Sequence, residues 1–203
     1  MIMPIAASSE LDQRLFWRLI EISTALSGER NTSRLFERIL DAAQDITHAD
    51  GGTLYLIKER EEGKPVLEFE IMRNNSLQLR LGGTSGNPIQ FAPLPLYRDD
   101  GSANHNNIAT HTALTREMVN IEDAYSVDYL DFSGTKAFDA RSGYRSQSFL
   151  TVPLCNHASE IIGVLPLTYI RSALFGRALV GSGFAVDGGL LTTHRKAQGL
   201  KGK

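Results

Sequence analysis

The sequence predicts an α+β fold in which an antiparallel sheet carries helices on one face and a loop-and-helix lid on the other. Three observations lead to this prediction. Two segments with helical periodicity open the chain, segments with the alternation of half-buried strands follow, and a long irregular stretch then leads into a closing hairpin. Helices that flank an antiparallel sheet without alternating with its strands are typical of the α+β class.

Two amphipathic helices are expected before residue 50. The first begins at Ser9, with Asp12 three residues on, and ends at Gly28. The second is capped by Asn31 or Thr32. Apolar residues at helical spacing form one stripe on each: Leu11, Leu15, Leu19, Ile22 and Leu26 on the first, and Leu35, Ile39, Ala43 and Ile46 on the second.

The first helix carries a second apolar stripe, made of Phe16 and Ile20. If the longer stripe packs on the domain, these two side chains remain without cover. We therefore expect a homodimer that forms through the first helix.

Strands are expected from residue 51 onward. "GGTLYLIKE" predicts a buried strand, and two alternating segments, with Leu67, Phe69 and Ile71 and then Leu77, Leu79 and Leu81, predict half-buried antiparallel strands. "IQFAPLPLY" contains two prolines, so we expect an edge strand or a loop there. The expected core positions are mostly among Leu67, Phe69, Leu79, Leu150, Val152 and Val164.

The last third of the domain combines an irregular segment with a hairpin. Residues 99–145 show little periodicity apart from a short helix near residues 108–116. Residues 149–154 and 161–165 are two apolar runs separated by a loop of hairpin length at residues 156–159. Because long irregular segments in compact domains are commonly functional or mobile, we expect a pocket beneath residues 99–145.

Composition and residue spacing exclude several classes of function. A formal net charge of −2 gives no support for nucleic acid or an anionic membrane as a partner. No apolar run is long enough to span a bilayer, the N-terminus lacks the features of a secretion signal, and a single cysteine, Cys155, suits a reducing cytoplasm. His105, His111 and His157 do not show metal-ligand spacing, and no serine lies in a nucleophile elbow. We expect neither catalysis nor a cofactor.

Three co-linear segments carry a family resemblance over residues 10–165: "LIEISTALSGERNTSRLFERILDAAQDITHADGGTLYLI", "REMVNIEDAY" and "SFLTVPLCNHASEIIGVL". Together they resemble a GAF domain, a small-molecule sensor module of signalling proteins with a GAF/PAS-like fold. The likeness is greatest to bacterial GAF modules ahead of cyclic-nucleotide or cyclic-dinucleotide phosphodiesterases, cyclases and histidine kinases. It implies a regulatory domain whose output enzyme domain is absent from this chain.

The chain departs from specialised GAF domains at two places. Cyclic-nucleotide-binding members carry an Asn-Lys…Phe…Asp-Glu motif, whereas this chain has only "TKAFDA" with no following Glu, which weighs against cyclic AMP and cyclic GMP. Bilin-binding relatives attach the chromophore through a cysteine in the irregular segment. Cys155 lies beyond that segment, so we expect no covalent bilin.

These considerations give a domain plan. Residues 1–9 are an N-terminal extension, residues 10–170 are the GAF domain, and residues 171–203 are an atypical tail, disordered, rearranged or artificial in origin. The tail includes "GSGFAVDGG", which resembles the closing segment of short-chain dehydrogenases, but the chain lacks their nucleotide turn and Tyr-x-x-x-Lys pair.

A ligand is expected between the sheet and the irregular segment. Because the hydrogen-bond donors of that segment include positively charged side chains, an anionic or nucleotide-like ligand is favoured over a neutral one. The expected ligand-binding residues are Asn107, Tyr125, Phe132, Thr135, Lys136, Phe138, Asp139, Arg141 and Tyr144. Six of them also have a plainer interpretation: Lys136 and Arg141 as solvated charges, Asp139 as a member of a surface pair with Arg141, and Phe132, Phe138 and Tyr144 as rings packed on the sheet.

Three functions remain open at this level. The first is a sensory module, and the second is a structural dimerisation module with an empty or collapsed pocket. The third is an enzyme like the GAF-like proteins that reduce methionine sulfoxide. That chemistry needs an attacking and a resolving thiol, and one cysteine cannot supply both.

Overall fold

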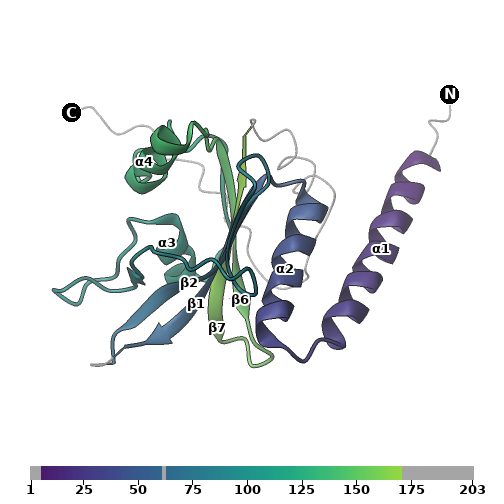
Figure 1. The fold of residues 1–203 in the computed structure, drawn as a ribbon, viewed down its shortest axis with the longest axis horizontal. Helices are drawn as coiled ribbons and strands as arrows, with labels where there is room; N and C mark the ends of the chain where they lie inside the picture. The colour runs from purple at the N-terminus through teal and green to yellow at the C-terminus, as the bar shows by residue number, and fades with distance from the viewer. Residues whose placement is uncertain (1–5, 61–62, 171–203) are drawn as a thin grey trace, which may run out of the picture.

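The computed structural model describes residues 6–60 and 63–170, which form three layers. Helices α1 (Ala6–Ser27) and α2 (Thr32–Thr47) lie on one side of a central sheet, and α3 (Ile108–Thr115) and α4 (Ser133–Ser142) lie on the other (Figure 1). This arrangement confirms the α+β prediction, with α3, α4 and their connecting loops forming the lid. The expected tail, residues 171–203, lies outside the described residues. Among the described helices none is long and apolar enough to cross a membrane.

The sheet has seven strands, and every pairing between the described strands is antiparallel. Their spatial order is β3-β2-β1-β7-β6-β5, and β4 pairs with β2 outside this path. The closing hairpin thus places its second strand beside β1, at the centre. The strands are β1 (Gly51–Glu59), β2 (Pro65–Asn74), β3 (Leu79–Gly82), β4 (Leu94–Pro95), β5 (Val119–Ile121), β6 (Ser148–Cys155) and β7 (Ile161–Tyr169).

Helix α2 covers the sheet. Asn31 is its N-cap, as expected, because its side chain accepts a hydrogen bond from the N–H of Arg34. The buried stripe, however, is Leu40, Gln44 and Thr47, one position around the helix from the expected one. Leu40 packs against Leu54, Ile71, Leu165 and Leu167, all on the α2 face of the sheet.

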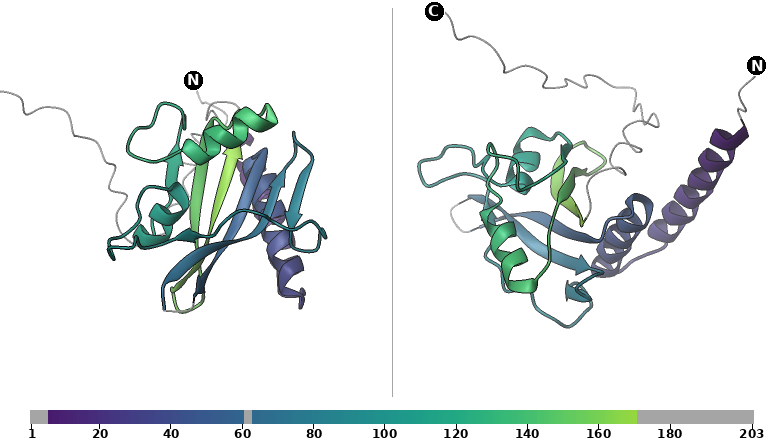
Figure 2. Two further views of the ribbon diagram at one scale, coloured as in Figure 1. Left: turned by 60° about the vertical axis from the view of Figure 1, so that its left-hand side comes forward. Right: turned by 90° about the horizontal axis from the view of Figure 1, so that it is seen from above.

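Helix α1 does not pack on the sheet but lies outside α2, and the two helices open into a V away from their connecting turn (Figures 1 and 2). The stripe expected to pack on the domain therefore does so only in part. Ile22 and Leu26 are half-buried, whereas Leu19 remains exposed. The helix begins at Ala6, before the expected Ser9, and ends at Ser27.

A β-bulge corrects the expected facing of β2. Leu54 of β1 pairs with Ile71, but the next residue, Tyr55, pairs with Phe69, so Glu70 is an extra residue on β2. Leu67 and Phe69 consequently face the lid, whereas Ile71 faces α2. Strict alternation had placed all three on one face, and one inserted residue reverses that pattern.

Other boundaries also differ from expectation. Leu77 lies in a turn rather than a strand, because Gln78 adopts a positive φ of 51° that ends the alternation. The short strand β5 and the helix α4 lie in the segment expected to be irregular apart from one helix. Of the six expected core residues, Leu67 and Val164 are fully buried, and Phe69, Leu79, Leu150 and Val152 are half-buried.

Pro166 is tolerated in the central strand β7 for a local reason. Pro166 lies on β7 between β1 and β6, where the pairing of β7 with β1 stops after Gly52↔Leu167 and resumes at Tyr55↔Val164. The missing donor of Pro166 therefore coincides with a gap in the ladder. Pro166 itself lies at the floor of the cavity described next.

Candidate functional site

A cavity of about 350 Å³ lies between the lid face of the sheet and helices α3 and α4, where the sequence predicted a pocket. Its floor comes from β1, β2 and the end of β7, and its roof from the beginnings of both helices and the last turn of α4. We call this space the lid cavity. Its volume falls in the range of small-molecule sites.

Aromatic rings form much of the wall. Tyr55 and Phe69 have ring centroids 4.5 Å apart, and Phe69 and Phe91 have theirs 5.4 Å apart, so three rings form a continuous surface at one side. The further aromatic lining residues are Phe138, Tyr144 and Phe149. Flat apolar walls of this kind suit a planar ligand ring.

The polar groups of the cavity favour negative charge. Among the described residues that line it there is no carboxylate, and two arginines are present. The guanidinium of Arg73 points to Glu37 of α2, with Nη2 2.6 Å from Oε1, so the charge of Arg73 is already neutralised. Arg141, on α4, makes no hydrogen bond or ion pair within the described part of the chain and is exposed at the cavity.

Two helix beginnings add partial positive charge. The first residues of α3, Ile108 and Ala109, and the first-turn residues Gly134 and Thr135 of α4 all line the cavity. N–H groups in a first helical turn have no partner within the helix, and the helix dipole favours anions there. Part of this capacity is used, because Asn107 accepts from the N–H of Ala109 and the Asp131 carboxylate accepts from the N–H of Ser133.

The comparisons with known proteins agree with this architecture. A family model described as "GAF domain" matches residues 31–178, which is well over half of the chain. The chain belongs to the GAF domain family. The resemblance recognised from three sequence segments is thus confirmed.

The relatives of this GAF domain are proteins of several different kinds. A "cGMP-specific 3',5'-cyclic phosphodiesterase" of Drosophila virilis is 29% identical over 158 residues, 76% of this chain but only 16% of that protein. The GAF domain of a phosphoenolpyruvate-protein phosphotransferase from Coxiella burnetii has a TM-score of 0.54 at 17% identity, covering 81% of this chain and 84% of that one. A free methionine-R-sulfoxide reductase from Neisseria meningitidis has a TM-score of 0.52 at 14% identity, covering 79% and 77%. These two structures show a shared fold.

The structure brings five of the nine predicted ligand-binding residues to the lid cavity of this GAF domain: Asn107, Thr135, Phe138, Arg141 and Tyr144. They come from the N-cap of α3, from α4 and from the residue after the C-cap of α4. Helix α4 is therefore the element that gathers most of them.

The other four predicted residues have contacts outside the cavity. Phe132 is buried with its ring 5.2 Å from that of Phe149. Asp139 is buried and accepts hydrogen bonds from the N–H and Oγ of Ser146 and from the Tyr125 hydroxyl. The Lys136 ammonium lies 5.2 Å from the centre of the Tyr125 ring. Tyr125, Lys136 and Asp139 thus hold the lid together, and Phe132 packs the lid on β6.

Most of the lining residues outside the predicted lid segments lie on the sheet. They include Met72 and Asn74, which face the lid because of the bulge at Glu70 of β2, and Tyr55, which alternates with Leu54 along β1. The apolar alternation was a usable signal for Phe69, but no local pattern distinguishes a strand residue under a cavity from one under a packed helix. The described residues contain no group of three metal-ligating side chains.

Proposed function

We propose that this GAF domain is a non-catalytic sensor that binds a planar, anionic molecule of nucleotide type in the lid cavity and reports its presence to an enzyme. One observation carries the proposal: an aromatic cavity without a lining carboxylate has an unpaired arginine and two helix beginnings at its roof. Aromatic walls suit a base, and the positive groups suit a phosphate.

The relatives suggest which molecule to test first. Cyclic GMP appears in the name of the phosphodiesterases that this chain resembles. The chain spans about a sixth of those proteins, so their activity is no more than a guide. Because "TKAFDA" departs from the cyclic-nucleotide motif, cyclic GMP is a probe here, and cyclic AMP and cyclic dinucleotides belong in the same screen.

A non-catalytic role agrees with the place of the single cysteine. Cys155 is exposed at the end of β6 and does not line the lid cavity. Thiol-dependent reduction of a bound substrate needs sulfur atoms within reach of that substrate. A thiol-dependent turnover assay with methionine sulfoxide is therefore expected to show no activity.

Arg141→Ala is expected to weaken nucleotide binding about tenfold or more, because a hydrogen bond between charged partners is worth about 1.5–3 kcal/mol. Isothermal titration calorimetry with cyclic GMP, cyclic AMP and cyclic dinucleotides measures the change. Arg145→Ala is the matched control, since Arg145 also belongs to the lid but lies 3.9 Å from the centre of the Tyr125 ring, away from the cavity.

Two outcomes would contradict this assignment. Equal losses in the Arg141 and Arg145 variants would show that Arg141 makes no ligand contact. The absence of any binder in the screen would favour a structural dimerisation module instead.

We also propose that the domain forms a homodimer through α1. Phe16, Trp17 and Ile20 are 58%, 62% and 39% exposed, and their helical spacing places them on a different face of α1 from the half-buried Ile22 and Leu26. Large apolar side chains on a helix are normally covered, and α2 lies on only one side of α1. A second copy of α1 offers a matching apolar surface.

Phe16→Glu is expected to shift the protein from dimer to monomer, because the new carboxylate would be desolvated at the helix contact. Sedimentation velocity at micromolar concentrations measures the change. Tyr129→Glu, at a 68% exposed aromatic on the lid, is the control that should leave the mass unchanged. A wild-type monomer at high micromolar concentration would refute the dimer.

A further inference from the structure

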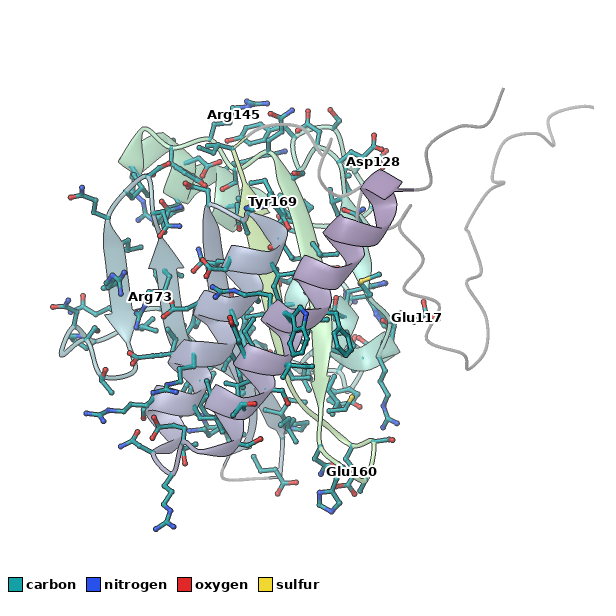
Figure 3. The ribbon with its side chains drawn as sticks, turned by 90° about the vertical axis from the view of Figure 1, so that its right-hand side faces the viewer. Arg73, Glu117, Asp128, Arg145, Glu160 and Tyr169 are labelled. Carbon is teal, nitrogen blue, oxygen red and sulfur yellow. The ribbon has the colours of Figure 1, made fainter. Side chains whose placement is uncertain are left out.

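A second cavity lies on the helix side of the molecule, where α1 and the end of α2 meet the end of β7. Its lining includes Arg18 of α1, Asp45 of α2, Tyr169 of β7 and Asp50, which directly precedes β1. Figure 3 views the molecule from this side, with Tyr169 near the two helices. The lid cavity and this second cavity share no lining residue.

A hydrogen bond between two side chains joins the walls of the two cavities. The hydroxyl of Tyr144, whose residue lines the lid cavity, donates to Oδ2 of Asp50 over 2.6 Å. Tyr144 is only 8% exposed. Burial, and then the hydrogen bond to the Asp50 carboxylate, raise the pKa of Tyr144, so the phenol remains a donor at physiological pH.

Asp50 connects this tyrosine with three other parts of the fold. Its Oδ1 accepts from Ser76 in the β2–β3 turn, and its carbonyl accepts from the N–H of Asn75 in the same turn. That carbonyl also accepts from Nε2 of Gln44 on α2, over 3.2 Å. Its own N–H donates to the carbonyl of Thr168 on β7. Asp50 thus links Tyr144 by hydrogen bonds to the β2–β3 turn, α2 and β7.

The connection continues from α2 to α1. Asp45 directly follows Gln44, and its Oδ2 lies 2.8 Å from Nη2 of Arg18 on α1. This ion pair is exposed and contributes little to stability, but it lies where α1 would have to move if the end of α2 moved.

We propose that Asp50 is a positioning residue that holds the Tyr144 wall of the lid cavity and couples it to the α2 end and α1. A role of this coupling in signalling rests on the proposed function, because it requires a ligand that contacts Tyr144 in the lid cavity. The coupling itself is a property of the protein without ligand. A chain of contacts alone does not prove coupling, so the test measures it directly.

The test is hydrogen exchange of the ligand-free protein, comparing wild type with Tyr144→Phe. This variant keeps the ring in the cavity wall and removes only the hydroxyl. The amides of Asn75 and Asp50, both hydrogen-bonded through the Asp50 backbone, are expected to exchange about three- to tenfold faster. Asp50→Asn should speed the same amides, and the double variant should exceed the larger single effect by less than about twofold.

Tyr125→Phe provides a matched control. The Tyr125 hydroxyl also donates to an aspartate, Oδ2 of Asp139 over 2.9 Å, but both residues belong to the lid. Its loss should speed exchange at Ser146, whose N–H bonds to the same carboxylate oxygen, and leave Asn75 and Asp50 unchanged. If Tyr144→Phe also leaves Asn75 and Asp50 unchanged, or acts as Tyr125→Phe does, the coupling is refuted.

A second measurement separates this inference from the proposed function. Trp17, the single tryptophan of the chain, lies on α1 and reports on that helix by fluorescence. With cyclic GMP as the probe, wild type should show a fluorescence change that Asp50→Asn loses while its binding stays within about threefold, since Asp50 does not line the lid cavity. If cyclic GMP does not bind, the choice of ligand fails while the exchange result decides the coupling. If the variant binds cyclic GMP and still shows the fluorescence change of wild type, the relay to α1 is refuted.

Discussion

Replacing Arg73 with alanine is expected to lower the free energy of unfolding by about 3–5 kcal/mol, the usual cost of removing one partner of a buried ion pair. The Arg73 side chain is 5% exposed and lies near α2 (Figure 3). Its Nη2 bonds Glu37 of α2 over 2.6 Å, and its Nη1 bonds the carbonyl of Leu81 on β3 over 3.1 Å. The substitution leaves the half-buried carboxylate of Glu37 without its cation.

Chemical denaturation with urea measures this loss, and Arg80→Ala is the matched control. Arg80 lies directly opposite Arg73 on β3 but is exposed, so its loss should cost less than about 0.5 kcal/mol. Similar costs for the two variants would show that the pair with Glu37 contributes little.

Acid titration gives an independent check of the same pair. Burial alone would raise the pKa of Glu37, but hydrogen bonds from the N–H and hydroxyl of Thr84 and the charge of Arg73 together hold it below its ordinary value. The pair therefore contributes fully above the unfolded pKa of about 4.5, and the contribution is lost as pH falls through the lower folded pKa. Wild type should lose more stability on acidification than Glu37→Gln does.

Gly163→Ala is the other substitution expected to have a large effect, with a loss of about 3 kcal/mol in the free energy of unfolding. Gly163 is buried on β7, where it pairs with Leu56 of β1. A methyl group on Gly163 would overlap the backbone oxygen of Tyr55, and backbone at the centre of a sheet cannot move aside without breaking the ladder.

Thermal and urea unfolding measure the effect of Gly163→Ala. Gly28→Ala is the control, because the nearest atom to a new methyl there is the carbonyl oxygen of Thr24 at 3.9 Å. A loss below about 1 kcal/mol for Gly163→Ala would mean that β1 and β7 can separate locally at low cost.

The position of the lid cavity was predictable from the sequence, but its composition was only partly so. The segment of residues 99–145 stood out by its irregularity, and it does provide most of the roof. Within it, the ring of Phe138 and the ring of Phe132 had equal claims, yet one lines the cavity and the other packs on Phe149. The two residues are six positions apart along α4 and its N-cap, so their rings point in different directions. Only the placement of the helix on the sheet decides which ring lines the cavity.

Local chemistry determined the parts of this protein that depend on neighbours in the sequence. The Asn31 cap, the helix before residue 115 and the hairpin around residues 156–159 follow from short-range hydrogen bonds and apolar spacing, so the chain itself specifies them. The same is true of the family, because the three segments that resemble GAF domains are continuous stretches of sequence.

Tertiary structure alone decided the features that depend on contacts between distant segments. The bulge at Glu70 exists because β1 and β2 pair in two registers, and it moves Ile71 to the α2 face. Asp50 and Tyr144 are 94 positions apart, and no periodicity in either segment indicates their hydrogen bond. Patterns in a sequence encode burial, which is a property of one segment, whereas a cavity wall and its connections are formed by several segments at once.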